Sequence, residues 1–163
     1  MSPDNFNWKE FHHSVILNSS GEKVYNLIST ADGLEKWFLG EVSFFRDTAE
    51  LRKTAIVQPE DKYRWEWLTK SFSSSGTVID ITDNSVSYTF GESFIITFRI
   101  EELNDRCKLV LHQKVNTVSE DDQFAYLNCA VCWVFFLTNI KSVIEYDIDL
   151  REKEVVDEAL VNQ

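Results

Sequence analysis

The chain has 163 residues, with 16 Lys and Arg against 27 Asp and Glu, which gives a formal net charge of −11 at pH 7. This length fits one domain, and the acidic balance argues against a nucleic acid or an anionic membrane surface as the main partner, because both repel negative charge. Aromatic residues make up 13% of the chain, with only five Gly and two Pro, so the composition excludes a disordered, collagen-like or disulfide-rich protein.

The N-terminus carries no basic segment followed by an apolar run, which is the pattern of a signal peptide. The longest apolar run covers residues 129–137, whereas a helix needs about 20 such residues to cross a bilayer. Three Cys residues in a chain of this length do not make a disulfide framework. We therefore expect a cytoplasmic protein without a membrane span.

The first part of the chain predicts one strand and two short helices. Residues 9–17 alternate between apolar and polar side chains, which is typical of a half-buried strand. A serine three residues before Glu22 indicates a capping box, and apolar residues follow at helical spacing to Ile28. Residues 30–33 interrupt this pattern, and residues 34–38 predict a second short helical turn.

The middle of the chain predicts strand after strand, separated by turns. Segment 73–76 and Gly91-Glu92 have the composition of turns. Turns at regular spacing between alternating runs are typical of an antiparallel meander with one covered face. The expected strands cover residues 41–45, 54–57 (a weak candidate), 63–67, 77–81, 86–90, 94–101 and 107–115.

The last part of the chain changes to helical periodicity. Residues 119–122 form a second capping box, with acidic side chains where the helix dipole favours them, and residues 120–146 predict one long helix. Its apolar stripe would cover the apolar face of the sheet, which gives one α+β domain over residues 1–163, with a core at 10–147 and an acidic tail at 148–163. The stripe consists of Tyr126, Cys129, Trp133, Phe136, Ile140, Val143 and Ile144.

Four stretches of the chain carry a family resemblance. They are residues 15–38 with a Leu-x-x-Trp end, residues 76–90 with a Gly-x-Val strand, residues 107–113, and residues 133–151 with a helix Trp and a charged exit. In this order they resemble the START-like or SRPBCC superfamily, and most of all the homologues of the activator of the heat-shock-protein-90 ATPase. The sequence departs from that family at Val131-Cys132, where a Gly is common.

The resemblance implies the helix-grip fold, in which a curved antiparallel sheet follows two short helices and a long C-terminal helix packs across it. In this superfamily the sheet and the long helix enclose an apolar cavity. Members bind lipids, hormones or polyketides there, and a minority catalyse reactions. The resemblance implies the cavity and does not imply a particular ligand, because one fold hosts many functions.

Inward-facing aromatic residues are the main candidates for a site. Some polar side chains occupy the same alternating, inward-facing strand positions and would orient a ligand that has one polar end. They are His13, Tyr63, Tyr88 and Gln113. The alternative is that these large side chains fill a solid core. We expect a pocket lined by His13, Tyr63, Trp65, Trp67, Tyr88, Phe90, Phe94, Phe98, Gln113, Cys129, Trp133 and Phe136.

The sequence gives little sign of catalysis. Cys129 and Cys132 match C-x-x-C, but they lie well inside the expected helix, where burial raises the pKa of a thiol, so we expect core packing rather than redox chemistry. A structural zinc site needs four Cys or His ligands, and His112 is expected to point outward without a visible carboxylate partner. None of the common catalytic or phosphate-binding motifs is present. We expect no catalytic residue, no metal and no cofactor.

These observations favour a module that binds an apolar or amphipathic small molecule. A co-chaperone-like protein-interaction module is the alternative, and a cavity enzyme of cyclase or hydrolase type is the third possibility. A continuous cavity above roughly 300 Å³ would favour ligand binding, and a packed interior would favour interaction through the surface.

A second set of large apolar side chains lies on the opposite arc of the long helix. A group of this size needs a cover. We expect a homodimer through paired helices, with the C-terminal residues 155–160 or the N-terminal Phe6 and Trp8 as alternative covers. The set consists of Phe124, Leu127, Val131, Val134 and Phe135.

Overall fold

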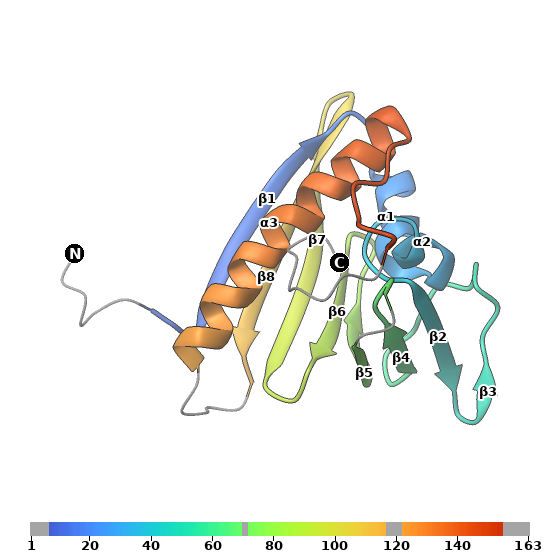
Figure 1. The fold of residues 1–163 in the computed structure, drawn as a ribbon. Coiled ribbons are helices and arrows are strands. Elements are labelled where there is room, and N and C mark those ends of the chain that lie inside the picture. The colour runs from blue at the N-terminus through green and yellow to red at the C-terminus, as the bar shows by residue number, and fades with distance from the viewer. Residues whose placement is uncertain (1–6, 70–71, 117–121, 155–163) are drawn as a thin grey trace.

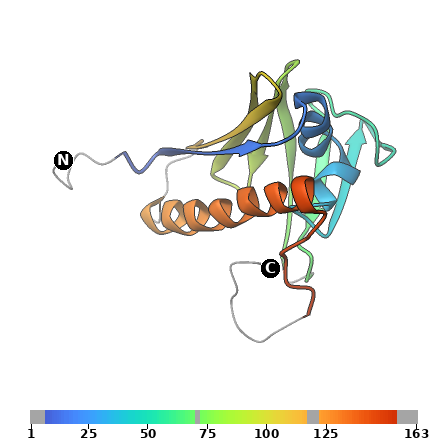
Figure 2. The ribbon, with the colours of Figure 1, turned by 90° about the horizontal axis from the view of Figure 1, so that it is seen from above.

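An eight-stranded antiparallel sheet carries one long helix across a single face, as Figure 1 and Figure 2 show. This computed structural model describes residues 7–69, 72–116 and 122–154. The strand order is β1-β8-β7-β6-β5-β4-β2-β3, so the first strand pairs with the last one. The expected α+β helix-grip fold is confirmed.

The elements follow the predicted order. The two short helices lie near the C-terminal end of the long helix, where they cover one part of the sheet (Figure 1). The bounds are β1 Glu10–Leu17, α1 Gly21–Ser29, α2 Ala31–Glu35, β2 Glu41–Arg46, β3 Ala49–Glu50, β4 Lys62–Glu66, β5 Ser73–Ile81, β6 Ser85–Phe90, β7 Phe94–Leu103, β8 Arg106–Val115 and α3 Asp122–Tyr146.

The helix α1 begins one residue later than its sequence pattern suggests, and α2 begins three residues earlier than its own pattern suggests. Ser20, rather than the serine three residues before Glu22, caps α1 by accepting a hydrogen bond from the backbone N–H of Lys23. Thr30 has extended backbone and caps α2 by accepting from the N–H of Gly33 at 3.0 Å. The predicted interruption at residues 30–33 is therefore a single extended residue, which ends one helix and starts the next.

Two predictions in the middle of the sheet were wrong. Residues 54–57 form no strand, and the short β3 pairs with β2 instead. Segment 73–76 is the start of β5 rather than a turn. Gly76 pairs with Tyr63 of β4, and a Cβ at Gly76 would collide with the Tyr63 ring. Small residues are needed on β5 because the neighbouring strand carries large rings.

The helix α3 has the predicted inner face. Trp133, Phe136 and Ile140 are buried against the sheet, and the capping pattern at residues 119–121 lies outside the described residues. By length and composition, Phe124–Tyr146 is apolar enough to cross a membrane. Its buried side is the core of the domain, and the buried Asn139 donates from Nδ2 to the carbonyl of Trp37 at 2.7 Å. Only 28% of the most apolar window of this helix is buried, so packing on the sheet accounts for one part of its apolar character.

The segment after α3 is tied to the core. Arg151 is only 7% exposed and donates to the carbonyl oxygens of Leu39 at 2.7 Å and Glu35 at 2.8 Å. Its guanidinium also bonds both carboxylate oxygens of Asp149 at 2.9 Å. The first residues of the expected acidic tail therefore belong to the packed structure.

Candidate ligand-binding pocket

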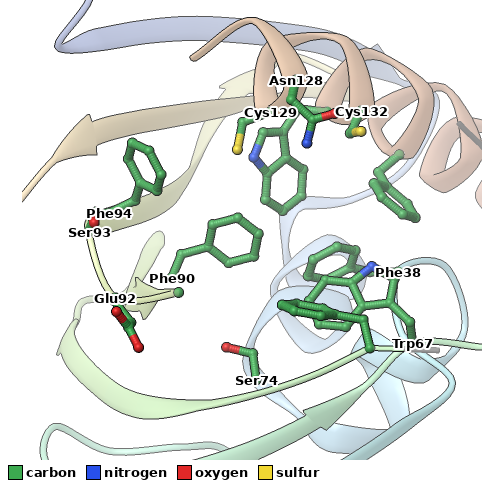
Figure 3. A pocket seen from close by; sticks show the side chains of 14 residues that line it. Phe38, Trp67, Ser74, Phe90, Glu92, Ser93, Phe94, Asn128, Cys129 and Cys132 are labelled. Carbon is green, nitrogen blue, oxygen red and sulfur yellow. The ribbon is translucent and has the colours of Figure 1, made fainter. Parts of the chain in front are cut away.

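A pocket of about 490 Å³ lies between α3 and one end of the sheet. Figure 3 shows its side chains converging from the helix, from the β6–β7 turn and from the segments that flank β4 and β5. Glu92 in the turn and Asn128 on α3 are exposed at its edge, so the pocket reaches solvent there. The lining residues are Phe38, Trp67, Phe72, Ser74, Phe90, Gly91, Glu92, Ser93, Phe94, Asn128, Cys129, Cys132, Trp133 and Phe136.

Aromatic rings make most of the wall. Trp133 is 2% exposed, and its ring centroid lies 4.8 Å from that of Phe38 and 5.6 Å from that of Phe90. Phe38 also contacts Trp67, whose ring centroid lies 4.8 Å from that of Phe72. These contacts pack the rings of Phe38, Phe90 and Trp133 together, whereas Phe72 is 58% exposed on the open side of the pocket.

The polar groups of the pocket gather at its edge. Ser74 lies on β5, Ser93 follows Glu92 in the β6–β7 turn, and Asn128 lies on α3. Gly91 adopts a positive φ of 56°, which a glycine tolerates without strain and which turns the chain back toward β7. Glu92 is the charged side chain among the lining residues. The pocket therefore has an apolar interior and a polar, negatively charged edge.

The two cysteines of the C-x-x-C pattern lie on the pocket side of α3. Both Cys129 and Cys132 are half-buried lining residues, as Figure 3 shows. Burial raises the pKa of both thiols, so they stay protonated near neutral pH. This state fits a weakly polar wall and does not fit a reactive thiolate.

The structure brings half of the expected lining residues to the pocket. The six are Trp67, Phe90, Phe94, Cys129, Trp133 and Phe136. The prediction for Trp133, that it packs on the sheet and also forms a pocket wall, is confirmed by its burial and position.

Four other expected residues pack into the solid core instead. Tyr63, Trp65, Tyr88 and Phe98 are almost completely buried and do not line the pocket. The hydroxyl of Tyr63 donates to the carbonyl of Thr89, and that of Tyr88 donates to the carbonyl of a helix residue, both at 2.6 Å. The hydroxyls of the two tyrosines are thus satisfied within the protein, whereas the buried indole Nε1 of Trp65 has no hydrogen-bond partner in the described part of the chain.

The last two expected residues also have internal partners. The Nε2 atom of His13 lies 3.0 Å from the carbonyl oxygen of Ala130 on α3. Gln113 is buried on β8 and accepts from the indole Nε1 of Trp133 at 2.7 Å. Inward parity placed both side chains under α3 correctly, but neither of them lines the pocket.

Several pocket residues had no sequence signal. Phe38 and Phe72 lie in connecting segments, and Glu92 and Ser93 lie in a turn, where no alternation marks an inward side. Ser74 was hidden because the start of β5 reads as a turn. Asn128 is the remaining polar residue at the pocket edge. Its position next to Cys129 on the helix is the one feature of the sequence that could have indicated it as a lining residue.

The outer arc of α3 remains exposed among the described residues. Phe124 is 74% exposed, Leu127 54%, Val131 57% and Val134 52%, whereas Phe135 is half-buried. Trp8 contacts Tyr126 on the other side of the helix at 5.3 Å between ring centroids. The alternative cover by residues 155–160, and by Phe6, lies outside the described residues.

The sequence of the chain matches one known protein family. The family described as Activator of Hsp90 ATPase homolog 1-like protein matches residues 18–145, which is most of the chain. The chain belongs to this family. The family resemblance predicted from the four sequence stretches is therefore confirmed. No curated protein matches the chain significantly.

Solved structures show the same fold at low sequence identity. A protein of Staphylococcus saprophyticus has a TM-score of 0.68 and 12% identity, with 87% of this chain and 96% of that chain covered. The Aha1 dimer from Colwellia psychrerythraea has a TM-score of 0.60 and 19% identity, covering 84% and 96%. A conserved protein of unknown function from Enterococcus faecalis has 0.65 and 17%, covering 91% and 77%. These similarities establish the fold of the family.

Proposed function

We propose that this protein binds an apolar or amphipathic small molecule in the pocket between the sheet and α3. The observation that carries the proposal is a pocket of about 490 Å³ that opens to solvent on one side and has mainly aromatic walls. Small-molecule sites typically enclose roughly 300–1,000 Å³ and are lined by apolar side chains with a few polar groups. The volume favours ligand binding over a surface-only interaction module.

The charge at the pocket edge supports a ligand with a neutral or cationic polar end. Glu92 and the overall charge of −11 disfavour an anionic head group, because like charges repel across the entrance. Ser74, Ser93 and Asn128 offer hydroxyl and amide groups that can donate to or accept from a neutral head. A long-chain alcohol or amine fits this edge better than a fatty acid.

Native mass spectrometry of the protein purified from its own host tests the proposal directly. A co-purifying mass that is lost on denaturation is the expected result. A second measurement uses Nile red, a neutral fluorescent dye, which is displaced by dodecanol, dodecylamine or dodecanoate. We expect the alcohol and the amine to displace the dye at lower concentration than the carboxylate.

A pocket-filling variant gives a matched control. Cys132 lines the pocket and Val131 beside it points outward, so Cys132→Phe fills the cavity and Val131→Phe adds the same ring outside. We expect Cys132→Phe to weaken dye binding at least tenfold and Val131→Phe to leave it unchanged. Equal effects of both variants, or dye binding by neither the wild type nor the variants, would refute the pocket as the binding site.

The alternative function within this family is a co-chaperone-like interaction. Its test is stimulation of the ATPase of heat-shock protein 90 by the purified chain, compared with the Cys132→Phe variant. Stimulation that survives filling of the pocket would favour the interaction module. Loss of dye binding without any ATPase effect would favour the binding module.

We also propose that the outer arc of α3 pairs with a second copy of this chain. Four apolar side chains that are more than half exposed on one helix arc form a patch that monomeric proteins rarely leave open. One similar protein, the Aha1 protein from Colwellia psychrerythraea, is described as a dimer. Paired helices related by a two-fold axis would cover both copies of the patch at once.

Sedimentation at tens of micromolar tests the dimer. We expect a dimer for the wild type and a monomer for the Val131→Glu/Val134→Glu variant. Ile16→Glu/Ile79→Glu is the control, because it places the same two charges at exposed apolar positions on the sheet. A monomeric wild type would contradict the dimer, and so would a double variant of unchanged mass.

A further inference from the structure

The outer face of the sheet, opposite to α3, brings together three side chains that can ligate a metal. His12 on β1 lies directly opposite His112 on β8, and Glu10 lies two residues earlier on β1, on the same face. The ligand atoms of the three groups all lie within 4.8 Å of one another. Two of the three His residues of the chain therefore meet at one point together with a carboxylate.

The three side chains of this group are in contact with one another. The two imidazoles are stacked with 4.0 Å between centroids and an interplanar angle of 10°. Nε2 of His112 lies 2.9 Å from Oε2 of Glu10, and Oε1 of Glu10 accepts from Nδ2 of Asn7 at 3.1 Å. The carboxylate partner of His112, which the sequence did not show, is thus supplied by the neighbouring strand.

We propose that Glu10, His12 and His112 form a surface site for a divalent transition-metal ion such as Zn²⁺ or Ni²⁺. Imidazole and carboxylate groups are the ligands that these ions prefer, and three protein ligands with water in the remaining positions are a common arrangement. The site is separate from the ligand pocket, because it lies on the other face of the sheet and shares no residue with it.

The geometry needs only small side-chain movements to accept an ion. Ligand atoms of a tetrahedral zinc site lie roughly 3.4 Å apart, given Zn–N and Zn–O bonds of about 2.0–2.1 Å. A pair of ligand atoms at the upper limit of 4.8 Å must therefore approach by roughly 1.4 Å, whereas Nε2 of His112 and Oε2 of Glu10, which lie 2.9 Å apart, must separate by roughly 0.5 Å. Glu10 and His12 are exposed and His112 is half-buried, so rotation about their side-chain bonds can close this gap without moving the strands.

The charged groups around the site include some that repel a bound cation and some that attract it. Lys114 lies opposite Glu10 in the register of β1 and β8, and burial together with the positive charge of Arg99 on β7 lowers the pKa of His12. Arg99 is itself paired with Glu101 at 2.7 Å, which offsets much of its repulsion of a cation. The net charge of −11 raises the local concentration of cations around the whole protein.

An ion at this site would link the first strand of the sheet to the last one. The β1–β8 pair joins residues 10–17 to residues 107–114, so a bound ion closes a loop of nearly the whole domain. A ligand that binds the folded state alone raises the stability of that state in proportion to the logarithm of its concentration. Metal binding is therefore expected to raise the melting temperature.

Calorimetric titration of the full-length protein with Zn²⁺ and with Ni²⁺ tests the proposal. We expect one ion per chain, with affinity at least tenfold lower in His12→Asn and in His112→Asn and several-fold lower in Glu10→Gln. Glu41→Gln removes an exposed strand carboxylate elsewhere and is expected to bind the ion as the wild type does. Melting curves without metal check that all four variants fold.

Nuclear magnetic resonance adds a readout at the level of each ring. With three His in the chain, the ring nitrogen signals are few, and Zn²⁺ is expected to shift those of His12 and His112 but not those of His13. The pocket thiols are the competing ligands. If Cys129→Ser/Cys132→Ser abolishes binding while His12→Asn leaves it unchanged, the proposal is overturned. Absence of binding at millimolar metal overturns it as well.

Discussion

The indole Nε1 of Trp133 donates a hydrogen bond of 2.7 Å to Oε1 of Gln113, and this bond joins α3 to β8 beneath the helix. Both residues are buried, at 2% and 1% exposure. Trp133 also forms a wall of the pocket, so the same side chain anchors the helix and shapes the cavity. The bond therefore couples the position of α3 to the shape of the binding site.

Replacing Trp133 by Ala should destabilise the fold strongly. Complete loss of a packed Trp costs roughly 3–5 kcal/mol, and we expect a value near the lower end because one side of the ring already faces the pocket. Urea unfolding followed by circular dichroism measures the change. Trp133→Phe keeps a ring but leaves Gln113 without its donor, so it should still lose about 1–3 kcal/mol.

A double-mutant cycle isolates the hydrogen bond. Gln113→Leu removes the acceptor, and the pair Trp133→Phe with Gln113→Leu removes both groups. We expect the double variant to be more stable than the sum of the single changes predicts, by about 1 kcal/mol, because it leaves no buried polar group unpaired. Strict additivity would mean that the two residues contribute independently.

The docking of Arg151 should matter more than its place near the C-terminus suggests. Arg151→Ala leaves the carbonyls of Leu39 and Glu35 without the guanidinium donor and removes the ion pair with Asp149, whose Oδ1 keeps the hydrogen bonds from Asn139 and from the backbone N–H of residue 151. We expect a loss of about 2–4 kcal/mol in the free energy of unfolding. Arg151→Lys keeps the charge but not the planar set of donors, so it should lie in between.

An exposed arginine supplies the comparison for this measurement. Arg64 has a side chain that is 64% exposed and pairs with Glu66 at the surface. Arg64→Ala is expected to change stability by less than about 1 kcal/mol. If Arg151→Ala is as mild as Arg64→Ala, the segment after α3 is not a part of the cooperative fold.

Alternation in the sequence was enough to predict most strands, but the start of β5 shows where it fails. Ser73 to Gly76 has the composition of a turn, and local preference alone assigns it as one. In the sheet, Ser74 lies opposite Trp65 and Gly76 opposite Tyr63. Small residues are selected there by the size of their neighbours, which is information from a different strand.

The pocket was only half predictable for a similar reason. Alternation along a strand tells which face of the sheet a side chain points to, but not whether an unfilled cavity lies over that part of the face. Tyr63 and Trp65 share the parity of Trp67, yet only Trp67 reaches the pocket. The hydrogen bond from Tyr88 to the carbonyl of Ile28 spans 60 residues of sequence, so no local pattern could reveal that its hydroxyl was already used.

The buried carboxylate of Asp61 should make stability depend on pH in the acid range. Burial by itself raises the pKa of Asp61, but hydrogen bonds from Arg46 and from the backbone N–H of Gln58 outweigh it and hold the pKa below the usual 3.8. Both carboxylate oxygens accept from Arg46, at 2.9 Å and 2.8 Å. The ionised form is thus favoured in the folded state.

The lowered pKa of Asp61 determines how the stability of the protein changes with pH. Because the pKa of Asp61 is lower in the folded than in the unfolded state, its contribution is present above pH 3.8 and is lost as the pH falls through the folded value. Asp61→Asn should therefore be destabilised by about 1–3 kcal/mol at pH 7, with the difference shrinking below pH 4. Unfolding curves between pH 2 and pH 7 measure it. A difference that stays constant over this range would contradict the argument.

The three thiols should react slowly and in a defined order. Burial raises the pKa of Cys107, Cys129 and Cys132, so each of them is protonated at pH 7, and the thiolate is the form that reacts. Cys107 has no exposed surface, whereas the other two line the pocket. We expect iodoacetamide to label Cys129 and Cys132 slowly at pH 7 and faster at pH 9, and to label Cys107 only after unfolding in urea.

Nile red bound in the pocket should slow labelling of the two pocket thiols alone. Labelling of Cys129 at pH 7 as fast as that of free cysteine would contradict the raised pKa of this thiol.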